Sequence, residues 1–229
     1  MRICILQHES DSPAGYFADW AQERGHRSQT LDVPSLTDWP AVDDYDLIVS
    51  LGSECSVHAS DDPWIGSEID FVRQAHEQSA PVLGICFGAQ LLAAALGGRV
   101  RPARQPQAQW REIPTSEPDL IPPGPWLRWH EDVFELPPGS RLVAGADDVP
   151  LAFVAGSSVG VQFHPEVNRE IAERWIDGGR ERIVTHGIDE AQLRAEMEQA
   201  VNGARERAFA LLDGIATACW RAPDRRTGA

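Results

Sequence analysis

Residues 81–90 read PVLGICFGAQ, an apolar run that leads through Cys86 into a helical pattern. Gly84 and Gly88 lie two residues to either side of the cysteine. Small residues at these places let a strand and the following helix approach closely while the middle side chain is held in a sharp turn. The stretch therefore predicts a buried strand, a tight turn that carries Cys86, and a helix. Together they form the cysteine version of a nucleophile elbow.

Cys86 is the nucleophile that we expect from this stretch. The helix after it would present free N–H groups and the positive end of its dipole to the sulfur, and both favour the reactive thiolate. A free cysteine is more often a small buried hydrophobe, and we interpret Cys4 and Cys219 in that way. The strand-turn-helix pattern separates Cys86 from them and favours a functional role.

The four cysteines are widely spaced and contain no C-x-x-C pair, so neither a structural zinc site nor any other metal site is expected. Scattered cysteines in a chain of 229 residues are typical of reduced thiols in a cytoplasmic protein. The N-terminal apolar run breaks at Gln7. It is too short for a signal peptide or a membrane span, and we interpret it as a first β-strand.

The charge of the chain restricts its partners. The formal net charge is −15, and all 20 basic residues are arginine. An acidic chain lacks the clustered basic surface that phosphate backbones require, so no nucleic-acid partner is expected. Because the chain has no lysine, Schiff-base chemistry and a P-loop lysine are excluded.

Short apolar runs alternate with helical patterns along the first hundred residues, which is typical of a parallel sheet with crossover helices. Beyond Gly98, short runs separated by proline and glycine predict further strands, some of them antiparallel. We expect strands at 2–6, 28–33, 46–51, 82–85, 110–113, 126–129, 141–144, 151–154 and 159–163, and helices at 13–23, 63–78 and 89–96.

The fold class that follows is α/β: an open, mostly parallel sheet with helices on both faces, added short antiparallel strands and a C-terminal helical extension. Apolar residues at helical spacing run through 189–216, with Gly203 as a weak point. We expect one domain at 1–188, a helical extension at 189–220 packed on the same domain, and a flexible tail at 221–229.

A cysteine nucleophile needs a proton acceptor, which a third group usually orients. His164 directly follows the apolar run 159–163, so it would lie at the carboxyl end of a buried strand, where ligands of open α/β sheets bind. Glu166 is two residues further on and can reach one ring nitrogen, which leaves the other for Cys86. The remaining histidines that lack such context, which we interpret as surface or loop residues, are His8, His58, His76 and His186.

The segments GICFGAQ at 84–90 and GVQFHPE at 160–166 together resemble the glutaminase domain of class I (triad) glutamine amidotransferases. LLAAALGGRV at 91–100 matches the run after the elbow, and WHEDVFELPPGSRLVAG at 129–145 resembles the stand-alone branch called GMP-synthase-like. The resemblance covers roughly residues 46–167 and implies a flavodoxin-like fold with Cys86 as nucleophile, His164 as base and acid, and Glu166 as orienter.

The resemblance also implies the remaining site residues. Gln90 would hold the substrate, and His130, Glu131, Asp132 and Val133 would line its amino-acid end. The oxyanion hole would use the N–H of Phe87 and one from the loop at Gly52 and Ser53. The family usually has Gly-Gly-Pro where this chain has Gly52-Ser53-Glu54, so a β-carbon at Ser53 could strain the loop. Similarly, Gln107-Ala-Gln-Trp110 replaces the common Glu-x-Gly-Trp.

The implied activity is hydrolysis of the glutamine side-chain amide through a γ-glutamyl thioester, with no cofactor. The ammonia could go to a separate synthetase, and the sequence leaves the oligomeric state open. The second hypothesis is a hydrolase of γ-glutamyl peptides or amides that uses the same three residues. An α/β-hydrolase would place its acid between the nucleophile and the histidine in chain order, whereas Glu166 follows His164. A non-catalytic module on this fold is disfavoured by the intact set of three.

Overall fold

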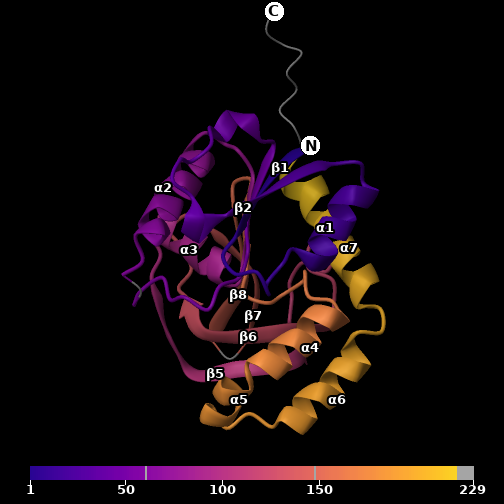
Figure 1. Ribbon diagram of the computed structural model, residues 1–229. Coiled ribbons are helices and arrows are strands. Elements are labelled where there is room, and N and C mark those ends of the chain that lie inside the picture. The colour runs from indigo at the N-terminus through magenta and orange to yellow at the C-terminus, as the bar shows by residue number, and fades with distance from the viewer. Residues whose placement is uncertain (60, 147, 221–229) are drawn as a thin grey trace, which may run out of the picture.

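The computed structural model of the chain describes residues 1–59, 61–146 and 148–220. A seven-stranded sheet in the order β2-β1-β3-β4-β9-β8-β7 runs through this described part (Figure 1). The first four ladders are parallel and the last two are antiparallel, which confirms the expected mostly parallel sheet. The strands are β1 (Arg2–Gln7), β2 (Arg27–Asp32), β3 (Leu47–Ser50), β4 (Val82–Ile85), β7 (Arg141–Ala146), β8 (Val149–Ala155) and β9 (Ser158–Val161).

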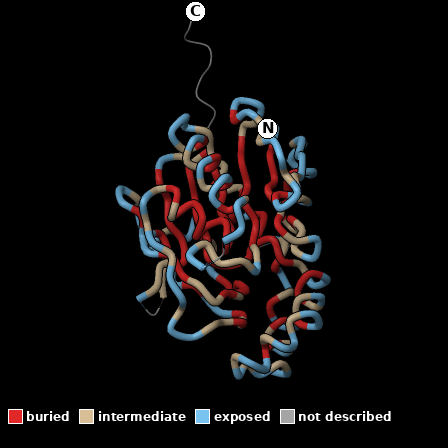
Figure 2. The backbone as a smooth tube through the Cα atoms, turned by 60° about the vertical axis from the view of Figure 1, so that its left-hand side comes forward, coloured by how far each residue is buried: buried red, intermediate tan, exposed pale blue. Residues whose placement is uncertain are grey.

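Helices cover both faces of this sheet, as expected. On one face, α1 (Gly15–Glu23) and α7 (Ala204–Cys219) pack side by side, and residues such as Phe17 and Leu211 join the core beneath them. On the other face, α2 (Pro63–Glu77) and α3 (Phe87–Ala95) enclose a second core around Phe71 and Leu91. Figure 2 shows the result: buried strands at the centre and exposed positions along the outer helices.

A second, antiparallel sheet consists of β5 (Val100–Glu112) and β6 (Pro125–Phe134). Both strands extend well beyond the short runs expected at 110–113 and 126–129. In β5, prolines and polar residues hide the strand pattern, and the pairing is irregular between Pro102 and Gln107 because proline cannot donate to a ladder. This sheet carries a third core, formed with α4 (Arg169–Gly178) and α6 (Glu190–Ala200).

The C-terminal stretch is helical, as expected, but it forms two helices. Gly203 adopts a left-handed φ of +74° and separates α6 from α7. α6 packs on β5 and α4, and α7 packs on α1. The short helix α5 (Arg180–Thr185) lies between α4 and α6, and two 3₁₀ turns occupy Val33–Ser35 and Val42–Asp44. The expected tail at 221–229 lies outside the described residues.

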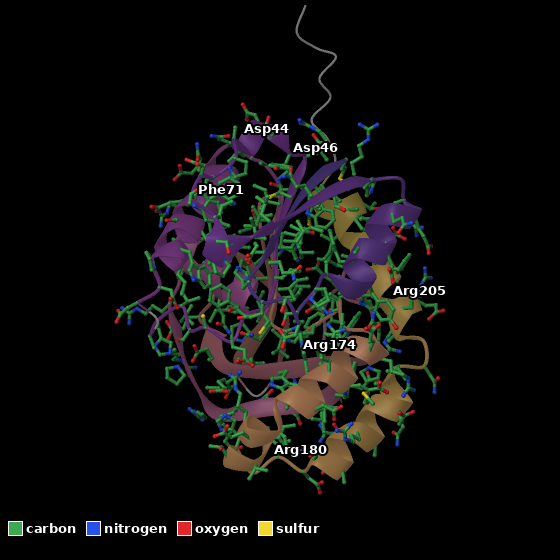
Figure 3. All side chains as sticks on the ribbon, in the orientation of Figure 1. Asp44, Asp46, Phe71, Arg174, Arg180 and Arg205 are labelled. Carbon is green, nitrogen blue, oxygen red and sulfur yellow. The ribbon has the colours of Figure 1, made fainter. Side chains whose placement is uncertain are left out.

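Charged side chains lie mainly at the periphery (Figure 3), where Asp44, Asp46, Arg174, Arg180 and Arg205 are labelled. Arg205, on α7, pairs with Glu23 on α1 across the outer surface. In the described ranges, no helix is both long and apolar enough to cross a membrane.

Candidate active site

Cys86 lies in the turn between β4 and α3 with φ +53° and ψ −105°, a backbone conformation that residues other than glycine rarely adopt. A β-carbon on Gly84 would meet Gly88 O at 2.4 Å, and one on Gly88 would meet Ser50 O at 2.1 Å. Both glycines are therefore required by the close approach of strand and helix. The Cys86 N–H donates to Val161 O at 2.8 Å, which ties the turn to β9.

His164 and Glu166 reach Cys86 because β4 and β9 are paired in parallel, so that their carboxyl ends meet at the same edge. The Nδ1 of His164 and Oε1 of Glu166 are 2.7 Å apart, and both side chains are 3% exposed. Cys86 lies close enough to the imidazole to help raise the pKa of His164. The structure thus brings together the three residues that the sequence nominated.

The carbonyl oxygen of Trp129, on β6, lies 3.2 Å from His164 Nε2 and 3.6 Å from Cys86 Sγ. It can accept a hydrogen bond from either group, and so it holds both side chains at one wall of the site. The backbone N–H of His164 donates to Leu127 O at 2.9 Å, which fixes the histidine to the same strand.

The electrostatic environment of His164 favours its charged form. Burial by itself lowers the pKa of His164, but the Glu166 carboxylate and Cys86 outweigh it. The pKa of His164 is consequently raised well above its ordinary value. A positively charged imidazole beside a sulfur stabilises a thiolate, which is the nucleophilic form.

Two buried glutamine side chains adjoin the cysteine. Gln90 Nε2 donates to Asp132 O at 3.0 Å and to Gln162 Oε1 at 3.4 Å. Gln162 Nε2 lies 3.6 Å from Cys86 Sγ. Gln90 was nominated by the resemblance, whereas Gln162 was not. Its place two residues before His164, in the same GVQFHPE segment, was the available signal.

A cavity of about 630 Å³ opens at the carboxyl ends of these strands. Trp175 on α4 packs its ring edge-on to His164, with the ring centroids 4.9 Å apart, and lines the cavity. Among the nominated residues in the described part, Glu166, Val133 and Phe87 lie outside this lining and are buried. The nominated residues that do line it are Gly52, Ser53, Cys86, Gln90, His130, Glu131, Asp132 and His164.

The model of the family described as "Glutamine amidotransferase class-I" matches residues 21–175 of this chain. The chain belongs to this family. The sequence resemblance is therefore confirmed.

Several relatives share this class I amidotransferase region. Gamma-glutamyl peptidase 5 of Arabidopsis thaliana is 31% identical, over 87% of this chain and 89% of its own length. A glutamine-hydrolyzing GMP synthase of Thermomicrobium roseum is 34% identical, over 59% of this chain. The chain matches only 26% of that synthase. A glutamine-hydrolyzing GMP synthase subunit of Sulfurisphaera tokodaii is 33% identical, over 54% of this chain and 69% of its own length.

Solved structures share the fold over nearly the whole chain. A glutamine amidotransferase from Thermotoga maritima superposes with a TM-score of 0.85 at 24% identity, covering 97% of this chain and 99% of that one. One from Methylobacillus flagellatus gives 0.86 at 21% identity, covering 100% and 99%. At these identities the likeness establishes the class I amidotransferase fold.

The departure from the family pattern at Ser53 causes no backbone strain, contrary to expectation. Ser53 is not among the described residues with positive φ. Its hydroxyl donates to Glu9 Oε1 at 2.6 Å, and the N–H of Glu54 donates to the same oxygen at 2.9 Å. The serine and the following residue thus anchor this amidotransferase loop to the end of β1.

His130 differs from His164 although both adjoin the cavity. It is buried, and burial together with the nearby charges of His164 and Arg128 lowers the pKa of His130 to about 3. His130 is therefore a neutral histidine at neutral pH.

Nearby, Arg182 on α5 pairs with Glu54 at 2.7 Å and with Glu131 at 2.6 Å, and all three line the cavity.

The surface assignment of His8 is wrong. His8 directly follows β1, is 5% exposed, and its ring contacts Trp64 and Phe87. Its Nε2 lies 2.8 Å from Glu68 Oε2. Because this partner is 60 residues away in the chain, no local pattern marked it.

Proposed function

We propose that this amidotransferase-family chain hydrolyses γ-glutamyl amides through a thioester on Cys86, with glutamine as a substrate. The observation that carries the proposal is the placement of Cys86 and a buried His164 against the same Trp129 carbonyl, with His164 bonded to Glu166 at 2.7 Å. Cys86 and His164 line a cavity large enough for an amino-acid substrate, and Glu166 acts on that site through His164.

The reaction has two halves. The Cys86 thiolate attacks the side-chain amide carbon and forms a tetrahedral intermediate. The intermediate collapses to the γ-glutamyl thioester as the C–N bond breaks, and the His164 imidazolium gives its proton to the leaving nitrogen. His164, now neutral, takes a proton from water, whose oxygen attacks the thioester. Glutamate leaves, and the Cys86 thiolate and the His164 imidazolium are restored. Glu166 holds the ring so that Nε2 faces the reacting atoms.

The negative oxygen of each tetrahedral intermediate needs hydrogen-bond donors. We assign this role to the N–H of Phe87, at the start of α3, and to the N–H of Ser53 in the loop at Gly52. A β-carbon on Gly52 would lie 3.2 Å from His164 Cε1, so this loop borders the reacting groups directly. Each such donor contributes roughly 3 kcal/mol to lowering the barrier.

Hydrolysis of γ-glutamyl peptides is the second candidate. Two observations favour it: the likeness to a γ-glutamyl peptidase extends over 89% of that protein, and the cavity has room for more than free glutamine. A cavity of about 630 Å³ lies within the roughly 300–1,000 Å³ range of pockets for drug-sized ligands. The same Cys86 chemistry would release an amino acid or peptide instead of ammonia.

A separate synthetase that accepts ammonia remains the alternative partner. The likeness to the Sulfurisphaera tokodaii protein covers 69% of that chain, which is named as one part of a glutamine-hydrolyzing GMP synthase. In that case, adding the synthetase should move nitrogen from glutamine into the product of the synthetase, so that less free ammonia is released for each glutamate formed.

The experiment compares ammonia release from glutamine with amino-acid release from γ-glutamyl dipeptides, for the wild-type protein and for Cys86→Ala. We expect the variant to lose both activities and to lose labelling by a glutamine-like electrophile. Cys219→Ser, at a half-buried cysteine on α7, is the matched control and should keep all three. Activity that persists in Cys86→Ala would refute the proposal, and the ratio of the two wild-type rates separates the two candidates.

A further inference from the structure

A chain of buried polar groups that the proposed reaction does not use runs from α2 to the loop at Gly52. Glu68, on α2, accepts a hydrogen bond from Ser50 Oγ at 2.7 Å through Oε1 and contacts His8 Nε2 at 2.8 Å through Oε2. His8 Nδ1 lies 3.1 Å from Gly52 O. The side chains of His8 and Glu68 have no exposed surface.

Burying these groups costs free energy unless every hydrogen bond is made. The His8 ring is also sterically fixed, stacked on Trp64 with centroids 5.2 Å apart and edge-on to Phe87 at 5.0 Å. Such a fully satisfied and rigid arrangement ends at the cavity, because it holds the carbonyl of Gly52, a residue that lines the cavity.

The protonation of His8 follows from its partners. A carbonyl oxygen can only accept, so Nδ1 must carry a hydrogen that it donates to Gly52 O. This holds whether the second proton of the pair resides on Nε2 or on Glu68. Burial by itself lowers the pKa of His8, but Glu68 and the Gly52 carbonyl outweigh it, and the pKa of His8 is raised.

The bond to Gly52 O determines where the next N–H points. In a planar trans peptide the C=O of residue 52 and the N–H of Ser53 point in opposite directions. A carbonyl held toward His8 therefore directs the Ser53 N–H away from His8. Gly52 also borders both catalytic side chains, since a β-carbon there would lie 3.2 Å from His164 Cε1 and 3.9 Å from Cys86 Cβ.

We propose that His8, held by Glu68, is a positioning residue that fixes the Gly52–Ser53 peptide so that the Ser53 N–H serves as an oxyanion donor. The inference rests on the proposed function, because it assigns a task within that reaction. A hydrogen bond to the carbonyl also polarises the peptide and makes its N–H a stronger donor. Glu9 holds the same loop from the next residue of the chain, through Ser53 Oγ and Glu54 N.

The test uses two substitutions at one position. The amide of His8→Asn can place an N–H donor where histidine carries Nδ1, so the bond to Gly52 O is retained. His8→Phe keeps a ring between Trp64 and Phe87 but has no donor. Both variants remove the contact with Glu68, so their losses of stability are comparable, and only His8→Phe releases the Gly52 carbonyl.

We expect kcat for γ-glutamyl amide hydrolysis to fall about 10²-fold in His8→Phe, as when one oxyanion donor is removed. KM should change little, because the donor acts in the transition state. His8→Asn should stay within about 10-fold of wild type, since its donor is preserved.

The rate at which iodoacetamide alkylates Cys86 should be the same in all three proteins, because alkylation of a thiolate forms no oxyanion. His76→Phe, at a half-buried histidine of α2 that bonds to Ser158, is the control for a general packing effect.

Equal kcat values for His8→Phe and wild type would overturn the inference, and so would a parallel fall in the alkylation rate. If His8→Phe does not fold, the double variant with Glu68→Leu removes the buried carboxylate as well, and the same expectations apply to it. A wild-type protein without hydrolysis would overturn the proposed function itself. Wild-type turnover with an insensitive His8 would overturn the positioning role alone.

Discussion

Two buried histidine–glutamate pairs lie beside the loop at Gly52, and they differ in what the second ring nitrogen faces. His164 contacts Glu166 through Nδ1 at 2.7 Å, and its Nε2 faces Cys86 and the Trp129 carbonyl. His8 contacts Glu68 through Nε2 at 2.8 Å, and its Nδ1 faces the Gly52 carbonyl. The two histidines are alike in their burial and in their carboxylate partner. Their roles therefore differ because of the group that faces the other ring nitrogen, which is a thiol for His164 and a peptide carbonyl for His8.

The largest effect should come from the pair that faces the thiol. His164→Gln removes the group that exchanges protons with the substrate, and kcat should fall by about 10⁴-fold or more, as in other nucleophile–histidine enzymes. Steady-state hydrolysis of the better γ-glutamyl substrate measures this change. His76→Gln is the control, and a loss smaller than about 10-fold in His164→Gln would contradict a catalytic role for this histidine.

Breaking the second pair, His8 and Glu68, should have its main effect on the stability of the fold. Glu68→Ala leaves His8 and the Ser50 hydroxyl buried without their acceptor, and the free energy of unfolding should fall by about 3–5 kcal/mol, as when a buried ion pair loses one partner. Urea denaturation followed by circular dichroism measures the change. Glu198→Ala removes an exposed partner of Arg169 and should leave stability unchanged. Equal stabilities of the two variants would show that the buried pair does not stabilise the fold.

His130 is a third buried histidine, but it has no carboxylate partner among the described residues. The pH dependence of stability should therefore differ between His130 and the two paired histidines. The pKa values of His8 and His164 are raised, so their contribution to stability is complete below about pH 6.5 and is lost as the pH rises through their folded pKa values. The pKa of His130 is lowered to about 3, so its contribution is lost as the pH falls below about 6.5, where the unfolded chain binds the proton.

Between pH 7 and pH 5, the wild-type protein should therefore lose about 2 kcal/mol of stability relative to His130→Gln. Urea titrations of both proteins at the two pH values give this difference directly. A difference of zero would mean that His130 titrates normally in the folded protein.

The sequence predicted what is encoded locally. The elbow at 84–88 and the His164–Glu166 pair are short segments whose residues meet within a few positions of one another. The parallel part of the sheet followed from apolar runs of four to six residues, of which 82–85 matches β4 fully. These features depend on neighbouring residues, and so pattern alone was sufficient.

What the sequence did not predict depends on distant partners. His8 and Glu68 are 60 residues apart, and Ser53 is hydrogen-bonded to Glu9, 44 residues before it. In β5, Pro102 and Pro106 argued against a strand that becomes stable only by pairing with β6. The role of Trp175 was missed for the same reason, since its contact with His164 exists only after α4 packs against the second sheet.

The pairing of β4 with β9 joins residues about 76 positions apart, from Leu83 with Val159 to Ile85 with Val161. Cys86 directly follows β4, and His164 lies three residues beyond the end of β9. Such non-local parallel pairing forms slowly in refolding, because a long loop must close before any contact is gained. The time at which a γ-glutamyl electrophile begins to label Cys86 during refolding therefore measures when the central sheet forms. The circular dichroism signal of helix formation reports earlier, local events.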